Sequence, residues 1–289
     1  MRRRGRLLRR DRLLRRDRLV RRQLRLNSLN RLLPNALTVL GLCAGLTGIR
    51  YGLQGNWQVG VAMIAAAALL DGLDGRIARL MGGPTEFGGE LDSLVDSIAF
   101  GVAPILLMFL WSLADAGGLG WAVTLVFAGC CVLRLARFNI AAADPDPPPW
   151  ASGFFSGVPA PAGAGLVLLP MILSFPTGWS FLSAPALTVP WSLAVSAMMI
   201  SRLPTYSFKR VRVSHGMVRP VLAAIVAFSA AAISEPWMTL SALIVVYIGT
   251  IPFSIRTFRR RRAEAAAALN AASGSVPSPA GGTEPDGPG

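Results

Sequence analysis

The chain has 289 residues, of which 53% are hydrophobic and only 15% are charged. A soluble domain carries roughly a quarter charged residues, so this composition excludes an ordinary soluble protein. The formal net charge is +14, but nearly half of the basic residues lie before residue 32 and most others flank apolar runs, which indicates membrane topology and anionic lipid headgroups rather than nucleic acid.

The N-terminal arm, residues 1–33, contains the hexad repeat RLLRRD, RLLRRD, RLVRRQ over residues 6–23. Six residues advance an α-helix by about 600°. The leucine pairs of the repeat therefore spread around a helix instead of forming one apolar face. We interpret this segment as a basic arm held near anionic headgroups.

Eight apolar runs follow the arm, and most have the length needed to cross about 30 Å of hydrocarbon. This pattern predicts an all-α integral membrane protein, a polytopic helical bundle. The predicted spans are residues 36–53, 57–79, 91–113, 119–141, 157–175, 186–203, 219–234 and 236–255.

The basic residues between and after the spans predict the orientation. Lys209, Arg210, Arg212 and Arg219 surround the connection between the sixth and seventh spans, and a run of arginines at 259–262 follows the eighth. The predicted outer loops hold almost no basic residue. By the positive-inside pattern, we expect a multi-pass protein of the cytoplasmic (inner) membrane, with both termini facing the cytoplasm.

Four aspartates lie beside the second and third runs. If the second span stays helical to Arg79, then Asp71, Asp74, Gly75 and Ala78 lie on one face at i, i+3, i+4 and i+7. Carboxylates at the edge of a membrane helix are costly and usually mark a functional site.

The second pair, Asp92 and Asp96, is spaced i, i+4 on the next helix. The glycine-rich connection 80–89 can fold the two helices side by side, so two acidic faces converge. Four such carboxylates would repel one another unless hard divalent cations such as Mg²⁺ or Mn²⁺ neutralised them. Gly75 and Gly88 let a nucleotide approach the backbone, and Arg79 can hold a phosphate.

A non-enzymatic alternative is a cation transporter or an inactive lipid scaffold that uses these acids structurally. A transporter more often places such groups near the bilayer midplane, on broken helices. The aspartates of this chain instead lie at one end of two spans, beside glycine-rich turns and an arginine. All four are present, which argues against a degenerate, inactive protein.

The motif over residues 71–96 resembles the signature of the CDP-alcohol phosphotransferases at every position. It reads Asp71-x2-Asp74-Gly75-x2-Ala78-Arg79-x8-Gly88-x3-Asp92-x3-Asp96. The resemblance implies that the four aspartates bind two divalent metals, Mg²⁺ or Mn²⁺, and that Asp96 also acts as the general base on the incoming alcohol. It further implies that the CDP moiety is bound by Asp71, Gly75, Ala78, Arg79 and Gly88.

The same resemblance implies a six-span catalytic core with a cytoplasm-facing cavity, usually in a homodimer. The expected organisation is then a basic arm, a membrane core over 34–210, about two additional spans over 211–258 and a disordered cytoplasmic tail over 259–289. The tail is expected to be disordered because Ala, Ser, Pro and Gly dominate its composition.

Further segments are similar to the bacterial and archaeal phosphatidylserine synthases of this family. In chain order they are Pro34-Asn35-x-x-Thr38, Phe87-Gly88-x-Glu90-Leu91-Asp92-Ser93, Phe100-Gly101-Val102-Ala103-Pro104, Arg134-x-x-Arg137-Phe138-Asn139, Phe155-x-Gly157-x-Pro159-x-Pro161 and Ser201-Arg202-x-Pro204-x-x-Ser207-Phe208-Lys209. This similarity implies transfer of a phosphatidyl group from CDP-diacylglycerol to L-serine, giving phosphatidylserine and CMP.

Serine also presents a carboxylate, which calls for arginine, lysine or backbone N–H donors. The candidate acceptor-binding residues are Arg134, Arg137, Asn139, Ser207 and Lys209. Each arginine has a competing interpretation as a topology-setting side chain that extends to the headgroups. The alternative acceptors, glycerol 3-phosphate and an inositol phosphate, carry a dianionic phosphate and would need a tighter basic cluster.

Overall fold

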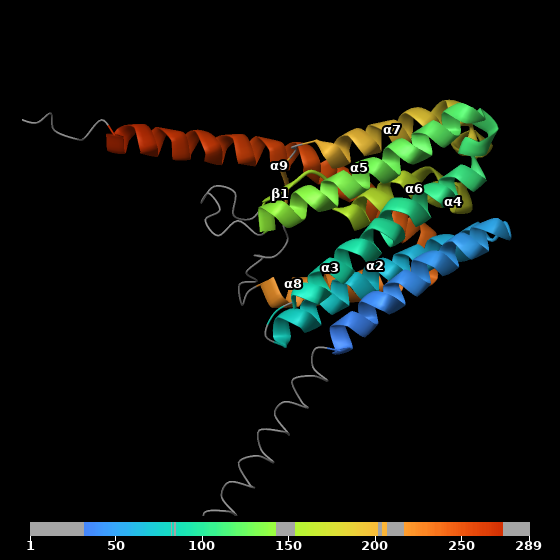
Figure 1. Cartoon of the computed structure of the whole chain (residues 1–289), viewed down its shortest axis with the longest axis horizontal. Helices are drawn as coiled ribbons and strands as arrows, with labels where there is room; N and C mark the ends of the chain where they lie inside the picture. The colour runs from blue at the N-terminus through green and yellow to red at the C-terminus, as the bar shows by residue number, and fades with distance from the viewer. Residues whose placement is uncertain are drawn as a thin grey trace, which may run out of the picture.

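The computed structural model describes residues 32–81, 83, 85–142, 154–201, 204–206 and 217–273; the N-terminal arm lies outside them. The helical elements are Leu32–Leu53, α2 (Trp57–Leu80), α3 (Glu86–Asp96), η1 (Ser97–Val102), α4 (Ala103–Trp111), η2 (Leu113–Ala116), α5 (Gly118–Ala142), α6 (Ala160–Thr177), η4 (Ser180–Ser183), α7 (Pro185–Ile200), α8 (Val218–Ser234) and α9 (Pro236–Ser273). Each predicted span coincides with one of these helices or helical runs (Figure 1), so the prediction of a polytopic helical membrane protein is confirmed.

Five helical runs of the described chain are long and apolar enough to cross a membrane. They are Leu32–Leu53, Glu86–Trp111, Gly118–Ala141, Ala160–Thr177 and Pro236–Thr257. The helices α7 and α8 correspond to shorter apolar stretches. The 24-residue helix α2 is not one of the five, and its last third carries the acidic and basic residues of the motif.

Prolines begin several of these helices, because a proline in the first turn has no N–H to leave unsatisfied and its φ already suits a helix. The helix α7 begins at Pro185, and α6 has a proline in its first turn. The helix α6 ends at Thr177 and is capped by Gly178, whose φ of 65° is left-handed, a conformation that glycine adopts without the steric cost of a Cβ.

The run from α3 to α4 is one helical path with a π-helical insertion, η1, directly after Asp96. Single π-turns inside α-helices are rare and occur frequently at functional sites. This insertion changes the register of the helix, so the acidic face of α3 and the apolar face of α4 can point in different directions around the helix axis. Phe100 of η1 is buried beside this change.

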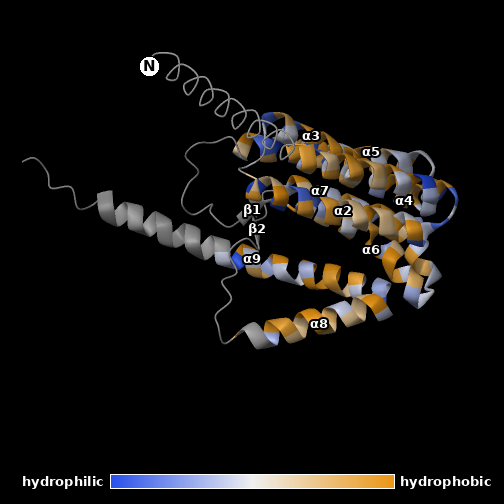
Figure 2. Cartoon of the chain, turned by 90° about the horizontal axis from the view of Figure 1, so that it is seen from below, coloured by the Kyte–Doolittle hydropathy of each residue, from blue (hydrophilic) through white to orange (hydrophobic). Residues whose placement is uncertain are grey.

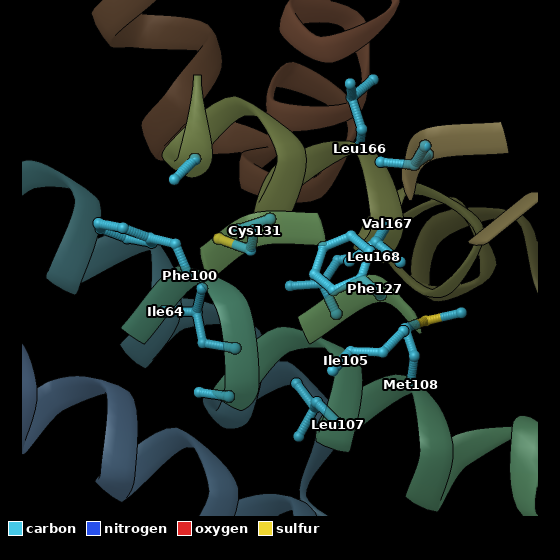
Figure 3. Packing of buried hydrophobic residues seen from close by; sticks show 14 of the residues in the cluster. Ile64, Phe100, Ile105, Leu107, Met108, Phe127, Cys131, Leu166, Val167 and Leu168 are labelled. Carbon is cyan, nitrogen blue, oxygen red and sulfur yellow. The ribbon is translucent and has the colours of Figure 1, made fainter. Parts of the chain in front are cut away.

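The buried core lies where η1, α4, α5 and α6 meet. Figure 3 shows Phe127 of α5 among Ile105 of α4 and Leu168 of α6, and all three side chains are at most 1% exposed. Across the bundle, α5 packs on α7 and α6 packs on α9. Because η1 directly continues α3, this core fixes the end of the helix that carries Asp92 and Asp96.

The last two helices form a pair, with α8 packed against α9 beside the remaining helices (Figure 2). The prediction of a disordered tail was wrong for residues 259–273, because α9 continues as one helix to Ser273. The segment after the span is rich in Arg and Ala, both strong helix formers. An existing helix needs no new nucleation to extend through such a segment. Residues 274–289 lie outside the described chain.

Two short strands were not predicted. The strand β1, Phe154–Ser156, pairs antiparallel with β2, Pro204–Tyr206, with Phe154 opposite Tyr206. The sixth span was expected to reach residue 203, but α7 ends at Ile200. A proline removes a helix donor and favours extended backbone before it, which accounts for the switch to a strand at Pro204.

Candidate functional site

Two of the four aspartates come from α2. Asp74 is only 4% exposed, and its Oδ2 accepts a hydrogen bond of 2.7 Å from the Thr38 hydroxyl of the Leu32–Leu53 helix. Asp71 lies one turn earlier and is partly buried. The acidic face of α2 therefore points inward, between neighbouring helices.

The other two aspartates come from α3, which begins earlier than predicted. The predicted span began at residue 91, whereas α3 begins at Glu86 with Thr85 as its N-cap. The Thr85 hydroxyl accepts a 3.0 Å hydrogen bond from the Gly88 N–H, an arrangement that stabilises a helix start. Gly88 therefore belongs to the first turn of α3, and the connection between the helices is shorter than expected.

The two helices bring their carboxylates together. One carboxylate oxygen from each of Asp71, Asp74 and Asp92 lies within 4.8 Å of the others. Asp96 lies outside this set of three but lines the same small cavity. Three converging carboxylates repel one another, and oxygen donors of this kind suit hard divalent cations. The donor set thus fits a metal ion.

A larger cavity of about 390 Å³ opens beside the three carboxylates, at the ends of α2, α3 and the Leu32–Leu53 helix. Three of the residues predicted to bind CDP, Gly75, Ala78 and Gly88, line it. Asp71 lines only the small acidic cavity, and Arg79 is exposed and lines neither of the two cavities. The cavity is the candidate nucleotide site.

The two glycines of the motif serve different steric needs. A Cβ at Gly75 would meet no atom within 4 Å, so this position leaves open space beside the acids. A Cβ at Gly88 would lie 2.9 Å from both the Asn35 Oδ1 and the Thr85 Oγ1, closer than real Cβ contacts. Gly88 therefore permits the close approach of α3 to the first helix.

Of the predicted acceptor-binding residues, Arg134 lies nearest to the acids. Its side chain is 8% exposed and interacts electrostatically with Asp71 and Asp96. The guanidinium also lies over the Phe138 ring, 5.5 Å from its centroid. The buried Nε has no hydrogen-bond partner within the part of the chain that the structure describes.

The other candidates are placed differently. An Arg137 guanidinium nitrogen donates to the Ile200 carbonyl oxygen at 2.8 Å, and the Asn139 side-chain amide donates to the Ser93 hydroxyl at the same distance. These bonds join α5 to the end of α7 and to α3. Ser207 and Lys209 lie outside the described residues.

Sequence reasoning assigned no site role to Asn35 or Thr38, although both line the candidate nucleotide cavity. In the sequence, the Pro34-Asn35-x-x-Thr38 segment indicates only a similarity to the family. Polar side chains in the first turns of an apolar span were the available signal, since such groups need a partner when buried.

The sequence of this chain is similar to family models and to known proteins. A family model described as CDP-alcohol phosphatidyltransferase matches residues 31–201, and one described as CDP-alcohol phosphatidyltransferase 2 matches residues 216–252. CDP-diacylglycerol--serine O-phosphatidyltransferase of Mycobacterium tuberculosis is 39% identical over 231 residues, 79% of this chain and 80% of that protein. The protein of the same name from Helicobacter pylori is 36% identical over 183 residues, covering 63% and 74%. Archaetidylserine synthase of Methanothermobacter thermautotrophicus is 31% identical over 173 residues, covering 59% and 68%.

Proposed function

Because this chain belongs to the CDP-alcohol phosphatidyltransferase family, we propose that it transfers the phosphatidyl group of CDP-diacylglycerol to L-serine, giving phosphatidylserine and CMP. The observation that carries this proposal is the group of three carboxylates beside a glycine-lined cavity. Relatives that cover most of the chain are named for the same reaction.

Asp71, Asp74, Asp92 and Asp96 would hold two divalent cations, Mg²⁺ or Mn²⁺. When bound, the cations screen the pyrophosphate and stabilise the charge of departing CMP. The cavity lined by Gly75 would hold the cytidine diphosphate. The pyrophosphate would then lie beside the carboxylates, because the nucleotide cavity and the small acidic cavity share Asp74 and Asp92 as lining residues.

Asp96 would act as the general base. The serine hydroxyl proton passes to the Asp96 carboxylate as the hydroxyl oxygen attacks the β-phosphorus of CDP-diacylglycerol. A new P–O bond to serine forms, and the bond between the β-phosphorus and the bridging oxygen breaks, so that CMP leaves. The place of Asp96 beside, but outside, the group of three carboxylates supports this separate role.

Arg134 would bind the carboxylate of serine, because its buried guanidinium lies near Asp96 and a carboxylate is the natural partner of an arginine. Arg137, Asn139, Ser207 and Lys209 complete the proposed acceptor site. The hydrogen bonds of Arg137 and Asn139 to neighbouring helices support a positioning role for these two side chains.

An acceptor screen tests the proposed reaction. Purified protein in detergent with CDP-diacylglycerol and Mg²⁺ or Mn²⁺ should release CMP when L-serine is added, and phosphatidylserine should form. Glycerol 3-phosphate and inositol phosphate should give little product, since their dianionic phosphate would need a tighter basic cluster than the proposed acceptor site offers. CMP release that depends on either of these acceptors would contradict serine as the acceptor. The transfer of a phosphatidyl group from CDP-diacylglycerol to an alcohol would still hold.

The proposal includes an orientation in the inner membrane, with both termini and the acidic site facing the cytoplasm. In this orientation the site is open to cytoplasmic serine and to the nucleotide part of CDP-diacylglycerol. In a cysteine-free background, a cysteine at Ser214 should be protected from a membrane-impermeant thiol reagent in intact cells. A cysteine at Thr177, at the end of α6, should be labelled. The reverse labelling pattern would mean that the bundle has the opposite orientation in the membrane. The family resemblance also favours a homodimer.

A further inference from the structure

An apolar groove of about 560 Å³ lies on the side of the bundle where α2, α6 and α9 meet. Its walls include the small residues Ala65 and Ala68 of α2 and Gly165 of α6, which leave the groove wide. The third wall is α9, which presents Leu243 to the groove. The helix α9 follows the segment that resembles the catalytic core, so this wall comes from an additional span.

The groove adjoins the acidic site. Phe100 lines both the groove and the small cavity that contains Asp71 and Asp96. On α2, Ala68 of the groove lies one turn before Asp71. The groove therefore begins within about one helical turn of the carboxylates that would face the phosphate of a substrate.

We propose that α9 closes this groove around an acyl chain of CDP-diacylglycerol, and that the side chains of α9 set the preference for acyl chains. The inference rests on the proposed function, which brings a diacylglycerol to this site. An apolar groove at membrane depth gains dispersion contacts from a hydrocarbon chain and offers little to the polar acceptor.

The walls leave room that larger side chains would fill. A Cβ at Gly165 would lie 3.6 Å from the Ile244 side chain, an ordinary contact, so a longer side chain added there would enter the space between α6 and α9. Leu243 is 52% exposed, so a larger residue there can extend over the groove without displacing the buried core. Two variants on opposite walls therefore test one groove.

The test compares two substrates in mixed micelles, dioleoyl and dihexanoyl CDP-diacylglycerol, with serine as the acceptor. In Leu243→Trp and in Gly165→Leu, the ratio of kcat/KM for the long-chain substrate to that for the short-chain substrate should fall at least about fivefold, the loss expected when one or two buried methylenes are displaced. The KM for serine should stay within about twofold, because no serine-binding group is changed.

Matched controls make the same changes elsewhere. Leu222→Trp on α8 and Gly129→Leu on α5 alter exposed positions that do not line the groove, and both should keep the wild-type ratio. An unchanged ratio in both groove variants would overturn the inference and leave the groove to bulk lipid or to a second copy of the chain. Wild-type protein that forms no phosphatidylserine from either substrate would instead refute the proposed function.

Discussion

Asp96→Asn is expected to lower kcat for serine at least about 100-fold, the usual contribution of a positioned general base. Asparagine keeps the size of the side chain and removes its basicity, so the serine hydroxyl proton has no acceptor. Binding of CDP-diacylglycerol in the presence of Mn²⁺ should largely survive, because Asp96 lies outside the group of three carboxylates. CMP release measures turnover, and equilibrium binding of labelled substrate measures affinity.

The control for this variant is Asp115→Asn, which removes an exposed carboxylate in η2, away from the acidic site. It should have the kcat of the wild type, which separates loss of a base from a general loss of negative charge. Turnover by Asp96→Asn within a few-fold of the wild type would assign the base to another group and leave Asp96 without its proposed role.

Asp92→Asn is expected to abolish metal-dependent nucleotide binding as well as turnover. Its carboxylate oxygen is one of three within 4.8 Å, and the amide that replaces it carries no charge to offset that of a divalent cation. The Kd for CDP in the presence of Mn²⁺ should rise at least tenfold, equivalent to about 1.4 kcal/mol. Titration calorimetry with and without Mn²⁺ measures this dependence, and Asp71→Asn should behave in the same way.

Together the aspartate variants separate the base from the group of three carboxylates, because only variants within that group should lose affinity for CDP. Glu90→Gln provides the control on the same helix, since Glu90 is exposed on α3 and lines neither the candidate nucleotide cavity nor the small acidic cavity. If Asp92→Asn bound CDP with an unchanged response to Mn²⁺, then Asp92 would not be a metal ligand.

The acceptor residues show how far sequence reasoning reached at the site. Arg134 and Arg137 are three residues apart, and either could have bound a ligand or extended to the headgroups. In the structure Arg134 is buried and interacts with the acids, whereas Arg137 caps the end of α7. Nothing in the local pattern distinguishes them, because the difference depends on which neighbouring helix each side chain meets.

The same limit applies to the partners of the aspartates. The i, i+3 and i, i+4 spacings predicted that two acidic faces would meet, since a helical period is a local property. They did not predict the hydrogen bond from Thr38 to Asp74, which joins residues 36 positions apart. They also missed the start of α3 at Glu86, because the Thr85 cap lies in a glycine-rich stretch that reads as a turn.

By itself the sequence determined the class of the protein, the positions of its membrane helices and the family of its motif, because hydropathy, charge and spacing act over short stretches of chain. Only the tertiary structure decided which carboxylates converge, which arginine lies near them and which helices line the apolar groove. The contribution of α9 illustrates the reason: its span was predicted from hydropathy, but its place beside α2 and α6 depends on how side chains from distant segments pack together.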